Sequence, residues 1–264
     1  MGRGIAVILA ILVIGAHLSD EIKSIEKKVI SVFGWVPEEN CACDDTDSSG
    51  ASGPYIYGFD ISQSNGDVAN TINSNYDSLG FIIIKATEGV TFVDSQYVNN
   101  SKTIDSTKFV RGFYHFYRVK DDPIKQADWY LDTVKYFSPT ALPPIVDLEY
   151  HDGEDHDLWT PKVMKGVLKF LKRIESKTGR KPMIYASSNF ANKRLTDSKF
   201  ADYPLWVANW RSTPPTLPGA WKGKKWQFWQ KSDSYMIGQH KTDLDVFNGN
   251  KSDLQAFIKS TSKK

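Results

Sequence analysis

The sequence places two carboxylic acids close together at the end of an apolar run, in Asp147-Leu148-Glu149. Side chains alternate along a β-strand, so Asp147 and Glu149 are expected on one face and Leu148 on the other. Like charges at this range raise the pKa of one acid, which then holds a proton near neutral pH. The spacing therefore predicts a proton donor beside an ionised partner.

Polar side chains also end most of the other apolar runs, and they include the acids Asp60 and Asp243. The remaining polar residues at these positions are Lys85, Glu88, His115, Trp206, Asn209, Gln230 and Asp245. Any single acid has a structural explanation, because it can bond to a neighbouring loop. Acids with perturbed pKa values cluster at functional sites, so the whole set indicates one polar site.

Eight apolar runs are typical of strands, and helical patterns separate the first of them. We expect strands at residues 55–62, 79–86, 110–117, 144–149, 182–186, 204–209, 225–230 and 242–247. We expect helices at residues 68–72, 95–107, 123–137, 160–178, 189–200 and 252–258. Alternation of this kind predicts an α/β fold with a parallel sheet, and eight strands predict a barrel with its chemistry at the carboxyl ends of the strands.

The last third of the chain departs from that rhythm. The two later connections contain Pro and Gly and show no helical period. We therefore expect an irregular TIM-like barrel, (β/α)5(β)3, over residues 55–264.

The first 54 residues differ in kind from the barrel. Residues 1–18 hold Arg3 and a short apolar run, which is typical of a signal peptide and too short to span a bilayer comfortably. An uncleaved signal anchor is the alternative, and both interpretations export the protein. Residues 19–54 predict an amphipathic helix followed by a flexible linker. Cys41 and Cys43 fall in that linker, either as thiols without a role or as cross-links between chains.

Composition excludes some classes of partner. A formal net charge of +2 over 264 residues does not favour nucleic acid. The spacing of His151, Asp152, Asp155 and His156 matches no standard metal site, so we expect a solvated loop and no metal or other cofactor. We expect His115 to be a hydrogen-bonded barrel residue, and the chain to be a monomer.

Eight short motifs in order carry a family likeness. They are Tyr57-Gly-Phe-Asp-Ile-Ser62, Ile83-Ile-Lys-Ala-Thr-Glu-Gly89, Gly112-Phe-Tyr-His-Phe116, Pro143-Pro-Ile-Val-Asp-Leu-Glu149, Pro182-Met-Ile-Tyr185, Leu205-Trp-Val-Ala208, Trp226-Gln-Phe-Trp-Gln230 and Thr242-Asp-Leu-Asp245. From about residue 55 to residue 258 the chain resembles the glycoside hydrolase family 25 muramidases, the lysozymes of Chalaropsis type. The resemblance implies a barrel whose last strands lack helices. It also implies cleavage of the β-1,4 bond between N-acetylmuramic acid and N-acetylglucosamine in peptidoglycan.

The resemblance also implies roles for individual residues. Glu149 matches the general acid, Asp147 its partner carboxylate, and Asp60 and Asp243 the other two acids. Tyr114 and Tyr185 match tyrosines that contact sugar in the cleft. Trp206 and Gln230, at strand ends, are expected to bind substrate. Four tryptophans are expected to divide between core and sugar-stacking positions, namely Trp206, Trp210, Trp226 and Trp229.

Three questions stay open at the level of sequence. An i, i+2 pair of acids fits retention or inversion, and we favour retention in which the substrate's N-acetyl group attacks while Asp147 orients it. A chitinase-like enzyme is an alternative to a muramidase, although Ile145 occupies a position where the acidic motif of such enzymes requires another acid. Another alternative is a catalytically silent glycan-binding barrel, although such a protein would not need all four acids.

Overall fold

The computed structural model describes residues 55–72, 79–151, 156–211 and 213–262. The expected signal segment, the amphipathic helix, the linker and both cysteines lie outside the described residues, as do Asp152 and Asp155. Within the described part of the chain, no helix has the length and apolar character needed to cross a membrane.

Eight strands form a closed ring. They are β1 (Ile56–Ile61), β2 (Leu79–Glu88), β4 (Val110–Phe116), β5 (Ile145–Asp147), β6 (Met183–Ser187), β7 (Leu205–Ala208), β8 (Phe228–Ile237) and β9 (His240–Phe247). Their order is β1-β9-β8-β7-β6-β5-β4-β2, and the β1–β2 pairing closes the ring. The short β3 (Phe92–Val93) pairs with β2 as a hairpin. The predicted irregular (β/α)5(β)3 barrel is confirmed.

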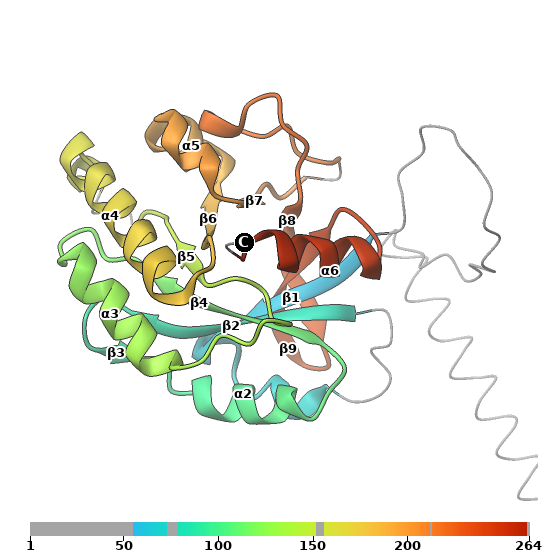
Figure 1. Cartoon of the computed structure of the whole chain (residues 1–264). Coiled ribbons are helices and arrows are strands. Elements are labelled where there is room, and N and C mark those ends of the chain that lie inside the picture. The colour runs from blue at the N-terminus through green and yellow to red at the C-terminus, as the bar shows by residue number, and fades with distance from the viewer. Residues whose placement is uncertain (1–54, 73–78, 152–155, 212, 263–264) are drawn as a thin grey trace, which may run out of the picture. The chain divides into compact units, whose positions relative to one another are not determined.

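Helices surround the first part of the barrel. They are α2 (Tyr97–Asp105), α3 (Pro123–Val134), α4 (Pro161–Thr178) and α5 (Ser188–Arg194), and α6 (Lys251–Ser260) follows the last strand. In Figure 1, α3 and α4 lie side by side against the barrel wall. The boundaries of α4 follow its sequence signals, because the Thr160 side chain caps the Val163 N–H and Gly179 adopts a left-handed conformation.

Two expected helices are shorter than the sequence pattern indicated. The helix expected at residues 68–72 is a single 3₁₀ turn, Ala69–Thr71. The helix expected at residues 189–200 is divided into α5 and a 3₁₀ segment, Ser198–Asp202. A new cap causes this division, since the Asp197 side chain accepts the Lys199 N–H and starts the second segment.

The last strand corrects the expected parallel sheet, because β9 runs antiparallel to both β8 and β1. A tight turn containing Gly238, with φ of +59°, joins β8 directly to β9. Asp243 therefore lies in the first half of β9, which meets the carboxyl ends of the parallel strands, and it faces Asp60 near the end of β1. Asp245 lies two residues further along β9, where it faces Gly58 and Gln230.

The strand β5 is also shorter than expected. It ends at Asp147, so Glu149 lies beyond it and the strand alternation does not fix the side of Glu149. The ladder continues for one bond on each side, where the Tyr117 N–H donates to the Asp147 carbonyl and the Leu148 N–H to the Tyr185 carbonyl.

Apolar side chains fill the lower half of the barrel interior, at the amino ends of the parallel strands. The residues that form this core are Ile56, Phe81, Ile83, Ile145, Met183, Phe228 and Phe247, and α6 adds Leu254, Phe257 and Ile258. Helix α6 therefore closes that end. A second, larger core lies between the strands and the outer helices.

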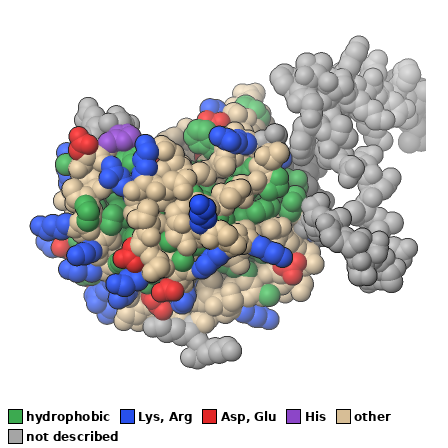
Figure 2. All heavy atoms as spheres, turned by 90° about the horizontal axis from the view of Figure 1, so that it is seen from above, with side chains coloured by type: hydrophobic (Ala, Val, Ile, Leu, Met, Phe, Trp, Pro, Cys, Tyr) green, Lys and Arg blue, Asp and Glu red, His purple; other side chains and the backbone are tan. Residues whose placement is uncertain are grey.

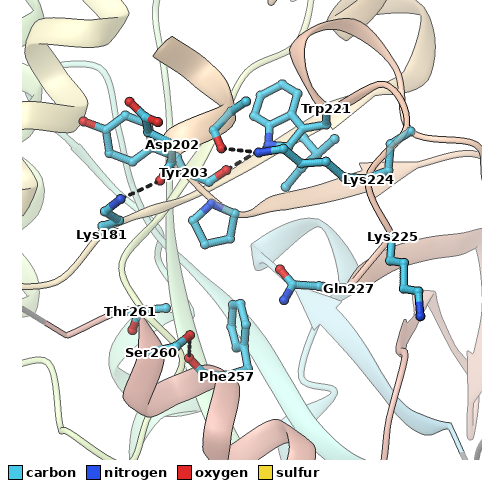
Figure 3. Close-up of a pocket in the computed structure, with 14 residues that line it drawn as sticks. Lys181, Asp202, Tyr203, Trp221, Lys224, Lys225, Gln227, Phe257, Ser260 and Thr261 are labelled. Atoms are coloured by element: carbon cyan, nitrogen blue, oxygen red, sulfur yellow. Dashed lines mark hydrogen bonds between the residues drawn. The ribbon is translucent and has the colours of Figure 1, made fainter. Parts of the chain in front are cut away.

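A pocket of about 230 Å³ opens at the closed end, beside α6 (Figure 3). Two of its three lysines bind backbone carbonyls of the chain, because Lys181 donates to the Asp202 carbonyl and Lys224 to the Ala201 carbonyl. The Trp221 indole donates to the Tyr203 carbonyl in the same way. None of the candidate acids lines this pocket.

Candidate active site

The candidate acids gather at the open end of the barrel. Asp60 lies near the end of β1 and faces Asp243 across the antiparallel pairing with β9. Asp147 is the last residue of β5. The charge of Glu149 raises the pKa of both Asp147 and Asp60, so Glu149 shares this end of the barrel with them.

Asp147 is almost completely buried, with 7% of its surface exposed. Burial raises its pKa well above the ordinary value, and the neighbouring charge of Glu149 adds to the effect. Lys85 acts in the opposite direction. Oδ1 of Asp147 has no hydrogen-bond partner among the described residues. Asp147 therefore favours its protonated form beside the charge of Glu149.

Gln230 joins two of the other acids. Its Nε2 donates to Oδ2 of Asp60 at 2.8 Å and to Oδ2 of Asp243 at 3.2 Å. Its Oε1 accepts from the Tyr185 hydroxyl at 2.9 Å and from the Trp210 indole at 3.0 Å. Protein side chains therefore use both donors and both acceptor positions of the amide, which fixes its orientation.

Mutual repulsion also marks this group of acids. Burial, then the charge of Asp243, raises the pKa of Asp60 well above its ordinary value. Burial, then the charge of Asp233, raises the pKa of Asp243 to about 6, although Lys241 and a hydrogen bond with Asp60 oppose the shift. The site therefore holds protons at pH values where isolated carboxyl groups are ionised.

Two tyrosines line the barrel beside the acids. Tyr114 and Tyr185 are each more than nine-tenths buried. Burial raises the pKa of both hydroxyls well above the ordinary value, and the surrounding acids raise it further. Both side chains are consequently neutral hydrogen-bonding groups at physiological pH.

The four tryptophans divide unequally. Trp206 is 2% exposed, and its indole donates to Oδ1 of Asp245 at 2.9 Å. Trp229 donates to the Asn209 carbonyl within the outer core, and Trp226 packs on Tyr55. Trp210 alone of the four has most of its surface exposed, 59%, and its indole N–H donates to Oε1 of Gln230. The exposed tryptophan of the site is thus Trp210, which sequence reasoning left unassigned.

A charged cluster lies at the ends of β2 and β4, the two strands between β1 with Asp60 and β5 with Asp147. Glu88 accepts a bond from Lys85 at 2.7 Å and two from Arg118. Burial raises the pKa of Glu88, but these bonds and charges outweigh it and lower the pKa. The Lys85 ammonium also lies 4.9 Å from the centre of the Phe116 ring. This cluster brings positive charge to the side of Asp147.

Two of the described histidines contact side chains other than the candidate acids. His115 is fully buried between the strands and α4, with Nδ1 2.8 Å from the Thr87 hydroxyl and its ring stacked on Phe170. Burial lowers its pKa to about 4, so it is neutral and is a hydrogen-bonded barrel residue, as expected. His156 stacks on Tyr150. Within the described ranges, no group of three His, Cys, Asp or Glu residues is arranged to hold a metal ion.

A barrel of this topology with carboxyl groups gathered at its open end has the groups that a glycoside hydrolase needs. The chain belongs to glycosyl hydrolases family 25, whose model matches residues 59–240. It is 34% identical over 212 residues to the N,O-diacetylmuramidase of Arthroderma benhamiae, covering 77% of this chain and 87% of that protein.

Solved structures agree with this assignment. A family GH25 lysozyme from Aspergillus fumigatus superposes with a TM-score of 0.67 at 31% identity, covering 78% of this chain and 99% of that one. A lysozyme from Streptomyces coelicolor gives a TM-score of 0.70 at 26% identity, covering 82% and 100%.

Proposed function

We propose that the chain is a peptidoglycan muramidase that cleaves the β-1,4 bond between N-acetylmuramic acid and N-acetylglucosamine. The observation that carries the proposal is the cluster of buried, proton-holding acids at the open end of a family 25 barrel. The related proteins are named as muramidases and lysozymes, which supports the same substrate.

Each acid then has a role in the proposed reaction. Glu149 is the general acid that protonates the leaving glycosidic oxygen. Asp147 is its partner, and it orients the substrate's N-acetyl group for attack on the anomeric carbon, with retention of configuration. Asp60 and Asp243 supply negative charge near the developing oxocarbenium ion.

Substrate contacts come from the same end of the barrel. Tyr114 and Tyr185 are neutral hydroxyl groups beside the acids and suit contacts to sugar. For Gln230 and Trp206 the proposed contribution to substrate binding is indirect, because their polar groups are engaged by Asp60, Asp243 and Asp245. Trp210 supplies an exposed indole face on which a sugar ring can stack.

The partner is a wall polymer outside the cell membrane. We propose that residues 1–18 export the chain as a signal peptide or anchor, that residues 19–54 form a helix and linker, and that residues 55–264 are a monomeric hydrolase barrel. Lys and Arg side chains predominate over Asp and Glu on the face shown in Figure 2. A basic surface of this kind favours a polymer whose peptide stems carry carboxylates.

Digestion of purified bacterial walls tests the activity. Wild-type protein is expected to clear the suspension, and Glu149→Gln is expected to lower kcat about 1,000-fold, because a general acid contributes on that scale. Mass spectrometry should find N-acetylmuramic acid at the new reducing ends. Asp132→Asn, an exposed change on α3, is the matched control.

Each alternative has its own result in this assay. If Glu149→Gln clears the suspension as fast as wild type, Glu149 is not the proton donor. Binding of walls without cleavage by wild type would identify a glycan-binding barrel. Cleavage of chitin oligomers in preference to walls would identify a chitinase-like enzyme. The first minutes of product formation, followed by NMR, test retention, which an inverted anomer would contradict.

A further inference from the structure

We propose that Asp245 is a positioning residue, a neutral carboxylic acid that donates a hydrogen bond to Asp60 and so fixes the pair Asp60 and Asp243. The inference rests on the proposed function, because it concerns the acids of that site. It adds a fifth carboxyl group, one layer deeper in the barrel than the four that the family likeness assigns.

The strand register places Asp245 under the other acids. In the antiparallel pairing of β1 with β9, Asp60 faces Asp243, and Gly58 faces Asp245. On the other side of β9, Asp245 faces Gln230 of β8. Residues two apart on a strand share a face, so Asp243 and Asp245 both point into the barrel. Asp245 is completely buried, whereas Asp243 is partly exposed at the open end.

The hydrogen bonds of Asp245 are incomplete unless it carries a proton. Oδ1 accepts the Trp206 indole N–H at 2.9 Å. Oδ2 is buried, and no donor faces it among the described residues. The charges of the two acids Asp60 and Asp243 act on it, and both oppose a second negative charge. A buried carboxylate in these surroundings is costly, and a proton on Oδ2 removes the charge and creates a donor.

The direction of the hydrogen bonds then follows. Burial, followed by the charges of Asp60 and Asp243, raises the pKa of Asp245 well above its ordinary value. Asp60 is the hydrogen-bonding neighbour of Asp245 in this group of acids. Because Oδ1 of Asp245 already accepts from Trp206, the proton lies on Oδ2 and is donated to Asp60. Negative charge is then directed to Asp60 and Asp243 at the open end.

Two substitutions separate a neutral donor from an anion. In Asp245→Asn, the amide oxygen still accepts from Trp206 and the amide N–H still donates to Asp60. Wild-type kcat is expected within about threefold, with an unchanged pH profile. In Asp245→Leu the donor is lost, and kcat should fall about 100-fold, the scale of a misplaced catalytic group, while KM stays within about twofold.

The outcomes are distinguishable. If Asn impairs kcat as much as Leu, Asp245 acts as an anion and the proposal is wrong; if neither variant changes kcat, it has no positioning role. If the Leu variant does not fold, infrared difference spectra of wild type minus Asp245→Asn at pH 7 still show whether Asp245 is protonated. They should show the carbonyl band of a protonated acid, and a carboxylate band instead would overturn the proposal. The infrared measurement does not require muramidase activity, so it tests Asp245 even if the proposed function is wrong.

Discussion

At the scale of single residues, the carboxyl groups at the open end of the barrel bind protons more strongly than isolated carboxyl groups do. Asp60, Asp147, Asp243 and Asp245 all have raised pKa values, and burial is the first cause for each. Repulsion between neighbouring acids is a further cause at each of them. The protein therefore keeps these groups close together at an energetic cost that a purely structural role would not explain.

This arrangement makes stability depend on pH. The pKa of Asp243 is about 6 in the folded state and about 3.9 for an ordinary Asp in the unfolded chain. Between these values the folded state binds more protons, so the free energy of unfolding falls as pH rises through 6. Asp243→Asn should show a smaller fall in Tm between about pH 4 and pH 7 than wild type. Parallel Tm curves, measured by calorimetry, would contradict this expectation.

Trp210 gives a second prediction at this scale. Its exposed ring is tethered to Gln230, so it presents a fixed apolar face beside the acids. Trp210→Ala should raise KM about 3- to 10-fold, the effect of losing one aromatic stacking contact. Trp210→Phe should recover most of that loss, because it keeps the ring. Steady-state kinetics on soluble glycan chains would measure both, and an unchanged KM in the Ala variant would exclude stacking.

The sequence predicts roles for four acids, Asp60, Asp147, Glu149 and Asp243, and these roles stay predictions. It marks Asp245 only as a polar residue near a strand end. The alternation rule that paired Asp147 with Glu149 applies equally to Asp243 and Asp245. The Gln230 network depends on side chains from four strands, β1, β6, β8 and β9, and on the segment after β7, and no local pattern indicates such contacts.

At the scale of elements, sequence located the strands better than their directions. Apolar runs predicted all eight barrel strands, because buried parallel strands are apolar on both faces. The antiparallel course of β9 was missed, since an apolar run has no polarity of its own. Gly238 between two runs was the available signal for a tight hairpin. The early end of β5 had no comparable signal.

Helix ends were predictable where capping residues mark them. Thr160, Pro161 and Gly179 fixed α4 to within a residue. The region after β6 was harder, because an Asp cap interrupts a pattern that otherwise continues. These differences lie on the outside of the barrel and leave the position of the acids unaffected.

At the scale of the whole molecule, both described cores lie between residues 56 and 258. Because the proposed barrel domain contains both of these cores, we expect a chain of residues 55–264 to fold alone and to cleave soluble glycan with a kcat within about twofold of the full chain. The rate on intact walls, measured in parallel, reports any contribution of the preceding segment. Loss of folding in the shorter chain, seen by circular dichroism, would contradict the proposed boundary.

The antiparallel β9 also determines when the enzyme becomes active during its synthesis. The bond from Gln230 to Asp60 joins residues 170 positions apart, and β9 must enter between β1 and β8 to close the ring. Until β8 and β9 have left the ribosome, Asp60 has neither Gln230 nor Asp243 beside it. Contacts of such long sequence separation form slowly. A wall-degrading activity built in this way stays silent in the nascent chain until β9 has been made and has entered the barrel.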